Sequence, residues 1–290
     1  MATAAQWVAG ARPRTLPAAV APVLVGTGAA AALDGFRAGP AVLALVVALA
    51  LQVAVNYAND YSDGRRGTDA DRVGPMRLVG SGAAAPRQVL LAAAAAFGVA
   101  ALAGLALAAL SSWWLVAVGA VCIVAAWTYT GGPLPYGYRA LGEVFVFVFF
   151  GLVAVVGTTF AQTRSVDGLA VAAAVPIGLL SVALLVVNNL RDITGDAAVG
   201  KRTLAVLVGD RGTRLAYAGL LAVAFVVVVL IGLVRPWALV ALLAVPLAVP
   251  PARTVLAGGR GPTLIAALQG TGLTTLATGV LLGAGLALSG

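Results

Sequence analysis

The stretch Asn56-Tyr-Ala-Asn-Asp60-Tyr-Ser-Asp63-Gly-Arg65-Arg66-Gly-Thr-Asp69-Ala-Asp71-Arg72 follows a long apolar run and holds four of the ten acidic residues in the chain. We call it the first acidic motif. It begins as Asn-x-x-x-Asp, so its polar side chains fall on one face if the preceding helix continues by even one turn. Such a face of amide and carboxylate oxygens can hold a metal ion.

A second acidic motif repeats the pattern after another apolar run. It reads Asn188-Asn189-Leu-Arg191-Asp192-Ile-Thr-Gly-Asp196, with Lys201 and Arg202 close behind. Carboxylates at the C-terminal end of a helix face the negative end of its dipole and repel one another, so a cation should offset that cost. Oxygen ligands favour Mg²⁺, usually completed by substrate phosphates. A solvated acidic loop is the alternative for either motif alone, and the repetition favours the metal.

Composition assigns the chain to the membrane. It has 290 residues, of which 61% are hydrophobic and only 10% are charged, whereas a soluble domain carries about 25% charged residues. The 36 glycines suit close helix packing in lipid. The net charge of +8 is too dispersed to indicate a nucleic-acid partner.

Missing residue types exclude several chemistries. The chain has no histidine and a single cysteine, Cys122, inside an apolar run. Haem or zinc ligation through histidine, Ser-His and Cys-His nucleophilic catalysis, and disulfide bonds are therefore excluded. Carboxylates, amides, hydroxyls, arginines and the one lysine remain for catalysis.

Hydropathy predicts an all-α fold in which residues 1–290 form a single domain of nine transmembrane helices, since each span needs about 20 apolar residues. The candidate spans are Thr15–Leu33, Pro40–Ala58, Gln88–Leu110, Trp113–Thr130, Ala140–Phe160, Gly168–Leu190, Leu215–Val234, Pro236–Leu256 and Thr263–Leu288.

The distribution of basic residues predicts the topology. Of the 18 lysines and arginines, all but Arg37, Arg164 and Arg235 fall at the N-terminus and in alternate connections. The positive-inside rule then places the N-terminus in the cytoplasm of a bacterial plasma-membrane protein. Both acidic motifs and the Tyr/Gly/Pro-rich connection from Tyr129 to Arg139 share that side. Tyrosines and prolines in this connection could also be interface anchors alone.

Two acidic clusters interleaved with basic residues are typical of a site for a polyanion, held through Mg²⁺ bridges and direct basic contacts. Diphosphate is the natural candidate, and its place at the mouth of an apolar bundle indicates a substrate with a charged head and an apolar tail. A transporter is the rival class. Transporters usually place ionisable groups near the middle of the bilayer, and these spans lack such groups. A structural scaffold leaves the paired motifs unexplained.

At the two motifs the chain resembles the UbiA superfamily of intramembrane aromatic prenyltransferases. The resemblance covers essentially the whole chain, beginning with Ala11-Arg-Pro-Arg-Thr-Leu-Pro17. Within the superfamily, both motifs, Asp71-Arg-Val-Gly-Pro75, Tyr129-Thr-Gly-Gly-Pro and Pro135-Tyr-Gly-Tyr look most like the 1,4-dihydroxy-2-naphthoate prenyltransferases of menaquinone biosynthesis.

The resemblance implies a role for each motif residue. The metal ligands would be Asn56, Asp60, Asp63 and Asp69 in the first motif and Asn188, Asp192 and Asp196 in the second. Asp60, Asp63, Asp192 and Asp196 would be catalytic. Diphosphate oxygens would be held by Arg191, Lys201 and Arg202. From the charge pattern itself, Arg65, Arg66 and Arg72 are further candidates for holding diphosphate. Candidates for placing the aromatic substrate are Tyr129, Tyr136, Tyr138 and Arg139, because a tyrosine or arginine face can stabilise a nearby cation or carboxylate.

One spacing departs from the superfamily pattern. Relatives often place the last acid of the first motif four residues after its predecessor, whereas six residues separate Asp63 from Asp69 here. Asp71 is therefore an alternative ligand, as is coordination by neither residue.

The resemblance also implies the reaction. With Mg²⁺ as cofactor, a polyprenyl chain would pass from polyprenyl diphosphate to 1,4-dihydroxy-2-naphthoate, with loss of CO₂, to give demethylmenaquinol. Another aromatic acceptor such as 4-hydroxybenzoate is the alternative, and membrane lipid would surround the enzyme.

Overall fold

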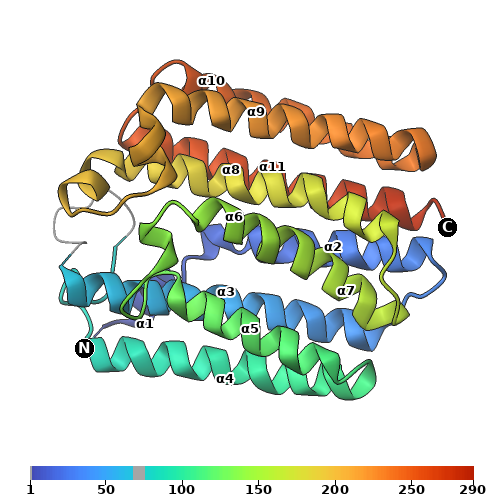
Figure 1. The fold of residues 1–290 in the computed structure, drawn as a ribbon, viewed down its shortest axis with the longest axis horizontal. Coiled ribbons are helices and arrows are strands. Elements are labelled where there is room, and N and C mark those ends of the chain that lie inside the picture. The colour runs from blue at the N-terminus through green and yellow to red at the C-terminus, as the bar shows by residue number, and fades with distance from the viewer. Residues whose placement is uncertain (1, 68–75) are drawn as a thin grey trace.

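The computed structural model describes residues 2–67 and 76–290, and within them the chain is helical, without a named strand (Figure 1). Asp69, Asp71 and Arg72 lie outside the described residues. The helical elements are α1 (Ala4–Ala11), η1 (Pro13–Thr15), α2 (Pro17–Ala32), α3 (Ala38–Arg66), α4 (Pro86–Leu110), α5 (Trp114–Thr128), η2 (Tyr136–Tyr138), α6 (Gly142–Val146), η3 (Phe147–Val153), α7 (Ala154–Thr163), α8 (Gly168–Ala198), α9 (Leu204–Val234), η4 (Pro236–Ala244), α10 (Val245–Leu256) and α11 (Pro262–Ala287).

Each predicted span overlaps a helical element, so the all-α membrane architecture is confirmed. Among the described residues, seven helices are long and apolar enough to cross a membrane. An eighth candidate span joins α1 and η1 to α2 across a bend of 48°. The predicted fourth span corresponds to α5, which has only 15 residues. Over residues 2–67 and 76–290 the count is therefore seven, or eight with the bent pair, and the short α5 makes this approximately consistent with the nine expected spans.

Two helices continue beyond the predicted spans, and the difference matters for the site. The second span was expected to end at Ala58, but α3 continues to Arg66 and ends at Gly67, which has a left-handed φ of 72°. The sixth was expected to end at Leu190, but α8 continues to Ala198. Hydropathy marks the apolar part of a helix, whereas backbone hydrogen bonding continues beyond it. Both acidic motifs therefore begin on helices rather than in loops.

Local sequence signals explain where several helices begin. Proline occupies the first position of α2, α4, η4 and α11, where its missing N–H costs nothing. The side chain of Asp167 caps α8, and that of Thr203 caps α9, by accepting hydrogen bonds from backbone N–H groups.

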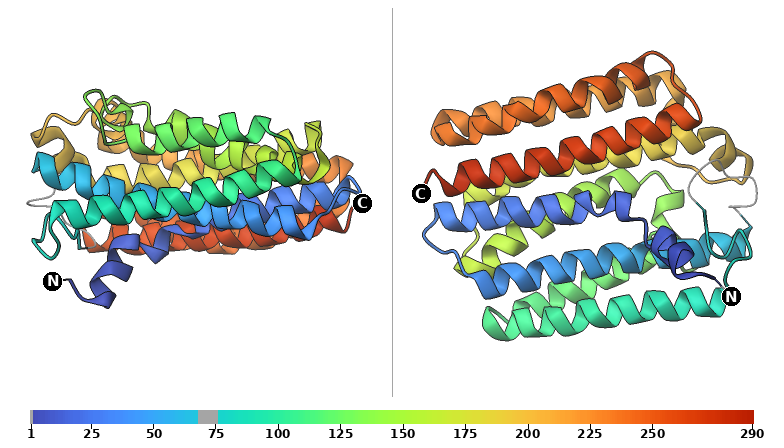
Figure 2. Two further views of the ribbon diagram at one scale, coloured as in Figure 1. Left: turned by 90° about the horizontal axis from the view of Figure 1, so that it is seen from below. Right: turned by 180° about the vertical axis from the view of Figure 1, so that it is seen from behind.

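Helices α2, α8 and α11 pack closely in the middle of the bundle (Figure 2). Small residues such as Ala21 and Ala174 are fully buried there. Gly28 of α2 shows how near the backbones approach, since a Cβ atom at this position would lie 2.1 Å from the carbonyl oxygen of Gly283 in α11. Helices that associate in lipid through small residues pack in this way.

The C-terminal ends of α3 and α8 lie at the same end of the bundle, together with the connection between α5 and α6 (Figures 1 and 2). This confirms that the two acidic motifs share one end. At the opposite end, Arg37 and Arg164 each donate a hydrogen bond to the carbonyl oxygen of Leu110. The assignment of the motif end to the cytoplasm stays a prediction.

Candidate active site

The polar side chains on the last turns of α3 form what we call the first arm of the site. Asp63, on the last turn of this helix, lies at its centre. Its side chain is buried, with 5% of the residue exposed. The hydroxyl of Tyr138 donates a hydrogen bond of 2.8 Å to Oδ1, and Nη2 of Arg77 lies 3.3 Å from Oδ2. One turn earlier on the helix, Oδ1 of Asn59 accepts a hydrogen bond of 2.7 Å from the hydroxyl of Thr130.

The second arm lies on the last turns of α8. The carboxylate of Asp192 receives two hydrogen bonds of 2.7 Å from the guanidinium of Arg191, which also donates to Oδ1 of Asn188 at 2.9 Å. Asp196, one turn further on, pairs with Nζ of Lys201 at 3.3 Å. Asn188, Asp192 and Asp196 follow one another at intervals of four residues, so they share one face of the helix.

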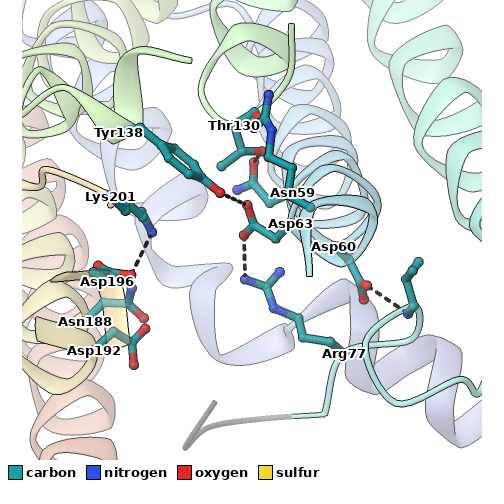
Figure 3. Close-up of polar contacts among 12 residues, drawn as sticks. Asn59, Asp60, Asp63, Arg77, Thr130, Tyr138, Asn188, Asp192, Asp196 and Lys201 are labelled. Carbon is teal, nitrogen blue, oxygen red and sulfur yellow. Dashed lines mark hydrogen bonds and ion pairs between the residues drawn. The ribbon is translucent and has the colours of Figure 1, made fainter. Parts of the chain in front are cut away.

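Tyr138 joins the two arms. Nζ of Lys201 lies 5.2 Å from the centroid of the Tyr138 ring, within the range of a cation–π contact. The backbone N–H of Arg202 donates a hydrogen bond of 3.1 Å to the carbonyl oxygen of Tyr138. A chain of contacts therefore runs from Asp63 through Tyr138 and Lys201 to Asp196, and the two arms face each other across it (Figure 3).

The space between the two arms is called the polar gap below. Two of the expected metal ligands do not point into it. Both carboxylate oxygens of Asp60 accept backbone hydrogen bonds, from Leu78 at 2.7 Å and from Val79 at 3.0 Å, on the side away from α8 (Figure 3). Asn56 lies two turns before Asp63, and its amide donates to Ala11. Asp60 thus anchors the segment that carries Arg77 to Asp63.

The expected diphosphate ligands divide into two groups. Arg191 and Lys201 lie beside the carboxylates of the second arm. Arg66 instead donates to the carbonyl oxygens of Thr130 and Gly132, and its guanidinium lies 5.3 Å from the centroid of the Tyr138 ring. Arg65 is exposed and donates to the hydroxyl of Tyr61. Arg202 is also exposed beside the second arm.

The expected aromatic-substrate residues also separate. Tyr129 and Tyr136 pack edge to face with ring centroids 5.4 Å apart, and both line a cavity. Burial raises the pKa of the Tyr136 phenol. This side chain therefore stays neutral at physiological pH. Tyr138 belongs to the polar gap, and Arg139 is exposed.

The cavity leads away from the first arm into the bundle. It has a volume of about 500 Å³ and is lined by α2, α3, α4, α5 and the segment from α6 to α7. Its wall is mostly apolar, with side chains such as Leu51, Ile123 and Phe149, whereas Asn56 and Asn59 mark the polar end. A cavity of this size, with few polar groups, is typical of a small-molecule site.

Some residues of the site were not among those singled out from the sequence. Asn59 and Asp63 repeat the four-residue spacing of Asn188 and Asp192, but Asn56 and Asp60 have the same spacing, and the sequence does not choose between the two registers. Arg77 comes from a distant part of the first connection. A buried pair, Glu143 and Asn189, adds a hydrogen bond of 3.0 Å behind the second arm.

The residues present fit a divalent cation that needs a further ligand. Within the part of the chain that the structure describes, no three carboxylates converge into a cage that could hold a metal by protein groups alone. The two arms supply carboxylate and amide oxygens with basic side chains beside them. Mg²⁺ commonly uses one or two carboxylates, waters and substrate phosphates, and this donor set suits that mode.

Comparisons with known proteins show what the chain is similar to. The model of the UbiA prenyltransferase family matches residues 19–263. The chain is 58% identical to the 1,4-dihydroxy-2-naphthoate octaprenyltransferase of Mycobacterium tuberculosis over 276 residues, which cover 95% of this chain and 94% of that protein.

Two solved structures share the fold. The apo structure of a UbiA homolog from Aeropyrum pernix has a TM-score of 0.69 at 19% identity, covering 93% of this chain and 97% of that one. A UbiA homolog from Archaeoglobus fulgidus, bound to DMAPP and Mg²⁺, has a TM-score of 0.62 at 16% identity, covering 96% of this chain and 99% of that one.

Proposed function

The chain belongs to the UbiA prenyltransferase family, and on that premise we propose that it transfers a polyprenyl chain from polyprenyl diphosphate to 1,4-dihydroxy-2-naphthoate. The observation that carries the choice of acceptor is the 58% identity, over nearly the whole of both chains, to a relative named for that reaction. The products are demethylmenaquinol, diphosphate and CO₂.

The polar gap between the two arms holds the diphosphate. Lys201 and Arg191 lie beside the carboxylates of α8, and Arg77 lies beside Asp63. These cations offset the charge of the carboxylates and can turn to phosphate oxygens, which are strong partners for lysine and arginine. The gap is therefore suited to a dianionic or trianionic head group.

Asp63, Asp192 and Asp196 would hold Mg²⁺ through their carboxylate oxygens, with Asn188 and Asn59 as the nearby amides. Bound there, Mg²⁺ would stabilise the negative charge that develops on the departing diphosphate. Asp60 and Asn56, the other two predicted ligands in the described part of the motif, support this arm through their hydrogen bonds to neighbouring segments. That ligand set is our proposal.

The apolar cavity takes the prenyl chain. Because the cavity begins at Asn59 and Tyr129 and continues among apolar side chains, a substrate with its head in the gap directs its tail into the bundle. Burial of the tail excludes water from the allylic carbon. The rings of Tyr136 and Phe145, stacked with centroids 4.0 Å apart, present aromatic surface near a carbon that gains positive charge.

The bond changes balance. The bond between the allylic carbon and oxygen breaks with both electrons passing to diphosphate, and a new carbon–carbon bond forms to the ring carbon that bears the carboxylate. Loss of CO₂ from the ring leaves its bonding electron pair behind, so aromaticity is restored.

The direct test is turnover by the purified protein in detergent or vesicles. We expect release of diphosphate and formation of demethylmenaquinol only when both substrates and Mg²⁺ are present. Prenylation of 4-hydroxybenzoate but not of the naphthoate would transfer the proposal to another acceptor. Passage of a substrate across sealed vesicles without release of diphosphate would instead indicate a transporter.

A further inference from the structure

Two arginines at the end of the bundle opposite the polar gap converge on one oxygen, and we call them the arginine pair. Arg37 directly precedes α3, and Arg164 directly follows α7. Nη2 of each side chain lies 3.2 Å from the carbonyl oxygen of Leu110, the last residue of α4. Because both distances end on the same atom, the two nitrogen atoms are at most 3.2 + 3.2 = 6.4 Å apart.

The protein does not neutralise the positive charge of the arginine pair. Within residues 2–67 and 76–290, neither side chain forms an ion pair with a carboxylate. The nearest acids in the sequence are Asp34, which is exposed, and Asp167, whose Oδ1 accepts a hydrogen bond from the N–H of Leu169. The C-terminal end of the α4 dipole supplies about half of one negative charge. Two positive charges therefore face less than one negative charge.

The arginine pair is accessible, and most of its N–H groups remain available. Each guanidinium carries five N–H groups, and within the described part of the chain each side chain donates only to Leu110. Arg164 is exposed and Arg37 is partly exposed, so a ligand can reach both. A phosphate offers several acceptor oxygens and matches the fork of a guanidinium. One phosphate can therefore bridge two arginines at this separation.

Exposed apolar side chains lie within a few residues of these groups. Phe36 directly precedes Arg37, and it is more than half exposed. Trp113 and Trp114 come shortly after Leu110, and 68% and 79% of these residues are exposed. Tryptophan is enriched at the level of lipid head groups, where its apolar ring meets the acyl chains and its N–H meets polar groups. The surroundings therefore favour the phosphate of a lipid over free phosphate.

We propose that the arginine pair binds the phosphate of an anionic phospholipid in the leaflet at this end of the bundle. The acyl chains of this lipid lie along the apolar flank of the protein. A head group with net negative charge offsets the two guanidinium charges, whereas a zwitterionic head group brings a cation of its own. The site is separate from the polar gap, because the arginine pair lies where α3 begins and Asp63 lies where it ends.

A lipid phosphate at this position connects three helices. Arg37, Leu110 and Arg164 belong to the ends of α3, α4 and α7, and residues of all three helices line the apolar cavity. The backbone N–H of Arg37 also donates a hydrogen bond of 3.2 Å to Oε1 of Gln162 on α7. Because the lipid binds this arrangement only in the folded protein, it stabilises the fold, and Tm should rise with its concentration.

The test uses the purified full-length protein, freed of lipid, in detergent micelles. Phosphatidylglycerol and phosphatidylcholine with identical acyl chains are titrated separately, the apparent Kd is measured by native mass spectrometry, and Tm is recorded. The double variant Arg37→Gln/Arg164→Gln removes both positive charges. Arg235→Gln is the matched control, because Arg235 follows α9 at the same end and donates to a single backbone carbonyl oxygen, that of Ser289.

Wild type and Arg235→Gln should bind phosphatidylglycerol at least about tenfold more tightly than phosphatidylcholine. The double glutamine variant should lose this preference, and the two lipids should then change its Tm equally. A wild-type protein without the preference would overturn the proposal, whatever the variants do. An undiminished preference in the double glutamine variant would place the anionic lipid at another site and would overturn the proposal as well.

Two further measurements cover a poorly folded variant and the source of the phosphate. Arg37→Lys/Arg164→Lys keeps both charges and should still prefer phosphatidylglycerol, so loss of the preference at an unchanged Tm would contradict a site based on charge. Inorganic phosphate should shift Tm equally in wild type and in the double glutamine variant, because the polar gap is intact in both. A shift confined to wild type and as large as that caused by phosphatidylglycerol would overturn the choice of a lipid.

Discussion

The hydroxyl of Tyr138 donates a hydrogen bond of 2.8 Å to Oδ1 of Asp63. This bond matters because Tyr138 comes from the connection between α5 and α6, whereas Asp63 ends α3. The same tyrosine ring lies beside Lys201. The side chain of Tyr138 therefore contacts residues from two motifs that are far apart in the sequence.

Removing that hydroxyl should weaken binding of the diphosphate substrate. In Tyr138→Phe the ring remains beside Lys201 but the bond to a charged carboxylate is lost, and such bonds contribute about 1.5–3 kcal/mol. We expect kcat/KM for polyprenyl diphosphate to fall at least about tenfold. Tyr217→Phe is the control, since it removes a buried hydroxyl bonded to Thr271 in another part of the core. An equal loss in both variants would argue against a specific role.

The carboxylates at the ends of α3 and α8 should be essential. We expect Asp63→Asn and Asp196→Asn each to lower turnover at least about 100-fold, because loss of electrostatic stabilisation at a leaving group has effects of this size. Turnover is measured as the rate of diphosphate release. Asp34→Asn is the matched control at the far end of the bundle, where asparagine tolerates the left-handed φ of 55°. Near wild-type rates in either site variant would place the metal elsewhere.

Removal of divalent cations should stop the reaction reversibly. Within the described residues the site lacks a cage of three carboxylates, so we expect Mg²⁺ to bind together with diphosphate rather than tightly on its own. Excess chelator should abolish diphosphate release, and added Mg²⁺ should restore it. The apparent affinity for Mg²⁺ should rise with the concentration of polyprenyl diphosphate. Full turnover in chelator would contradict the proposed chemistry.

The close approach of α2 and α11 should be sensitive to one methyl group. Gly28→Ala would place a Cβ atom 2.1 Å from the carbonyl oxygen of Gly283, so the backbones must separate. Overpacking of this kind costs about 1–3 kcal/mol, and the Tm in detergent should fall. Gly98→Ala in α4 is the paired control, because its Cβ atom meets nothing within 4 Å. A Tm change of the same sign and size in both would exclude packing as the cause.

The buried Tyr136 should make stability decline at alkaline pH. Burial raises the pKa of Tyr136 in the folded protein, whereas a tyrosine in the unfolded chain has a pKa of about 10. Above about pH 10 the unfolded state releases protons that the folded state retains, so the free energy of unfolding decreases as pH rises. Tm measured from pH 8 to 11 should decline less steeply for Tyr136→Phe than for wild type. An equal decline of Tm with pH in the two proteins would contradict a role of Tyr136 in this pH dependence.

The apolar runs were sufficient to predict the helices, because lipid allows few alternatives to a hydrogen-bonded helix. They were insufficient to predict the ends of α3 and α8, since hydropathy does not register a helix that continues past the apolar region. The pairing of the motifs at one end followed from the number of intervening spans. The choice between Asn56 with Asp60 and Asn59 with Asp63 depends on which face of α3 turns toward Tyr138 and the second arm, and this is a property of packing.

The sequence alone did not predict the long-range contacts of the site. Arg77 reaches Asp63 because Asp60 fixes the backbone of Leu78 and Val79, and no spacing rule connects these residues. The hydrogen bonds that Gln52 and Asn56 donate to the hydroxyl of Thr15 likewise depend on the fold of the N-terminal segment over α3. Conversely, Lys201 was recognisable as the only lysine in the chain, close behind Asp196.

The 15 residues of α5 extend only about 22 Å at the usual rise per residue, less than the roughly 30 Å of hydrocarbon in a typical bilayer. Hydrophobic mismatch of this kind is relieved by drawing the two leaflets together next to the protein. Because α5 forms part of the cavity wall, we expect the bilayer to be locally thinner beside α5. Lipid head groups would then lie nearer to the cavity there than elsewhere around the enzyme.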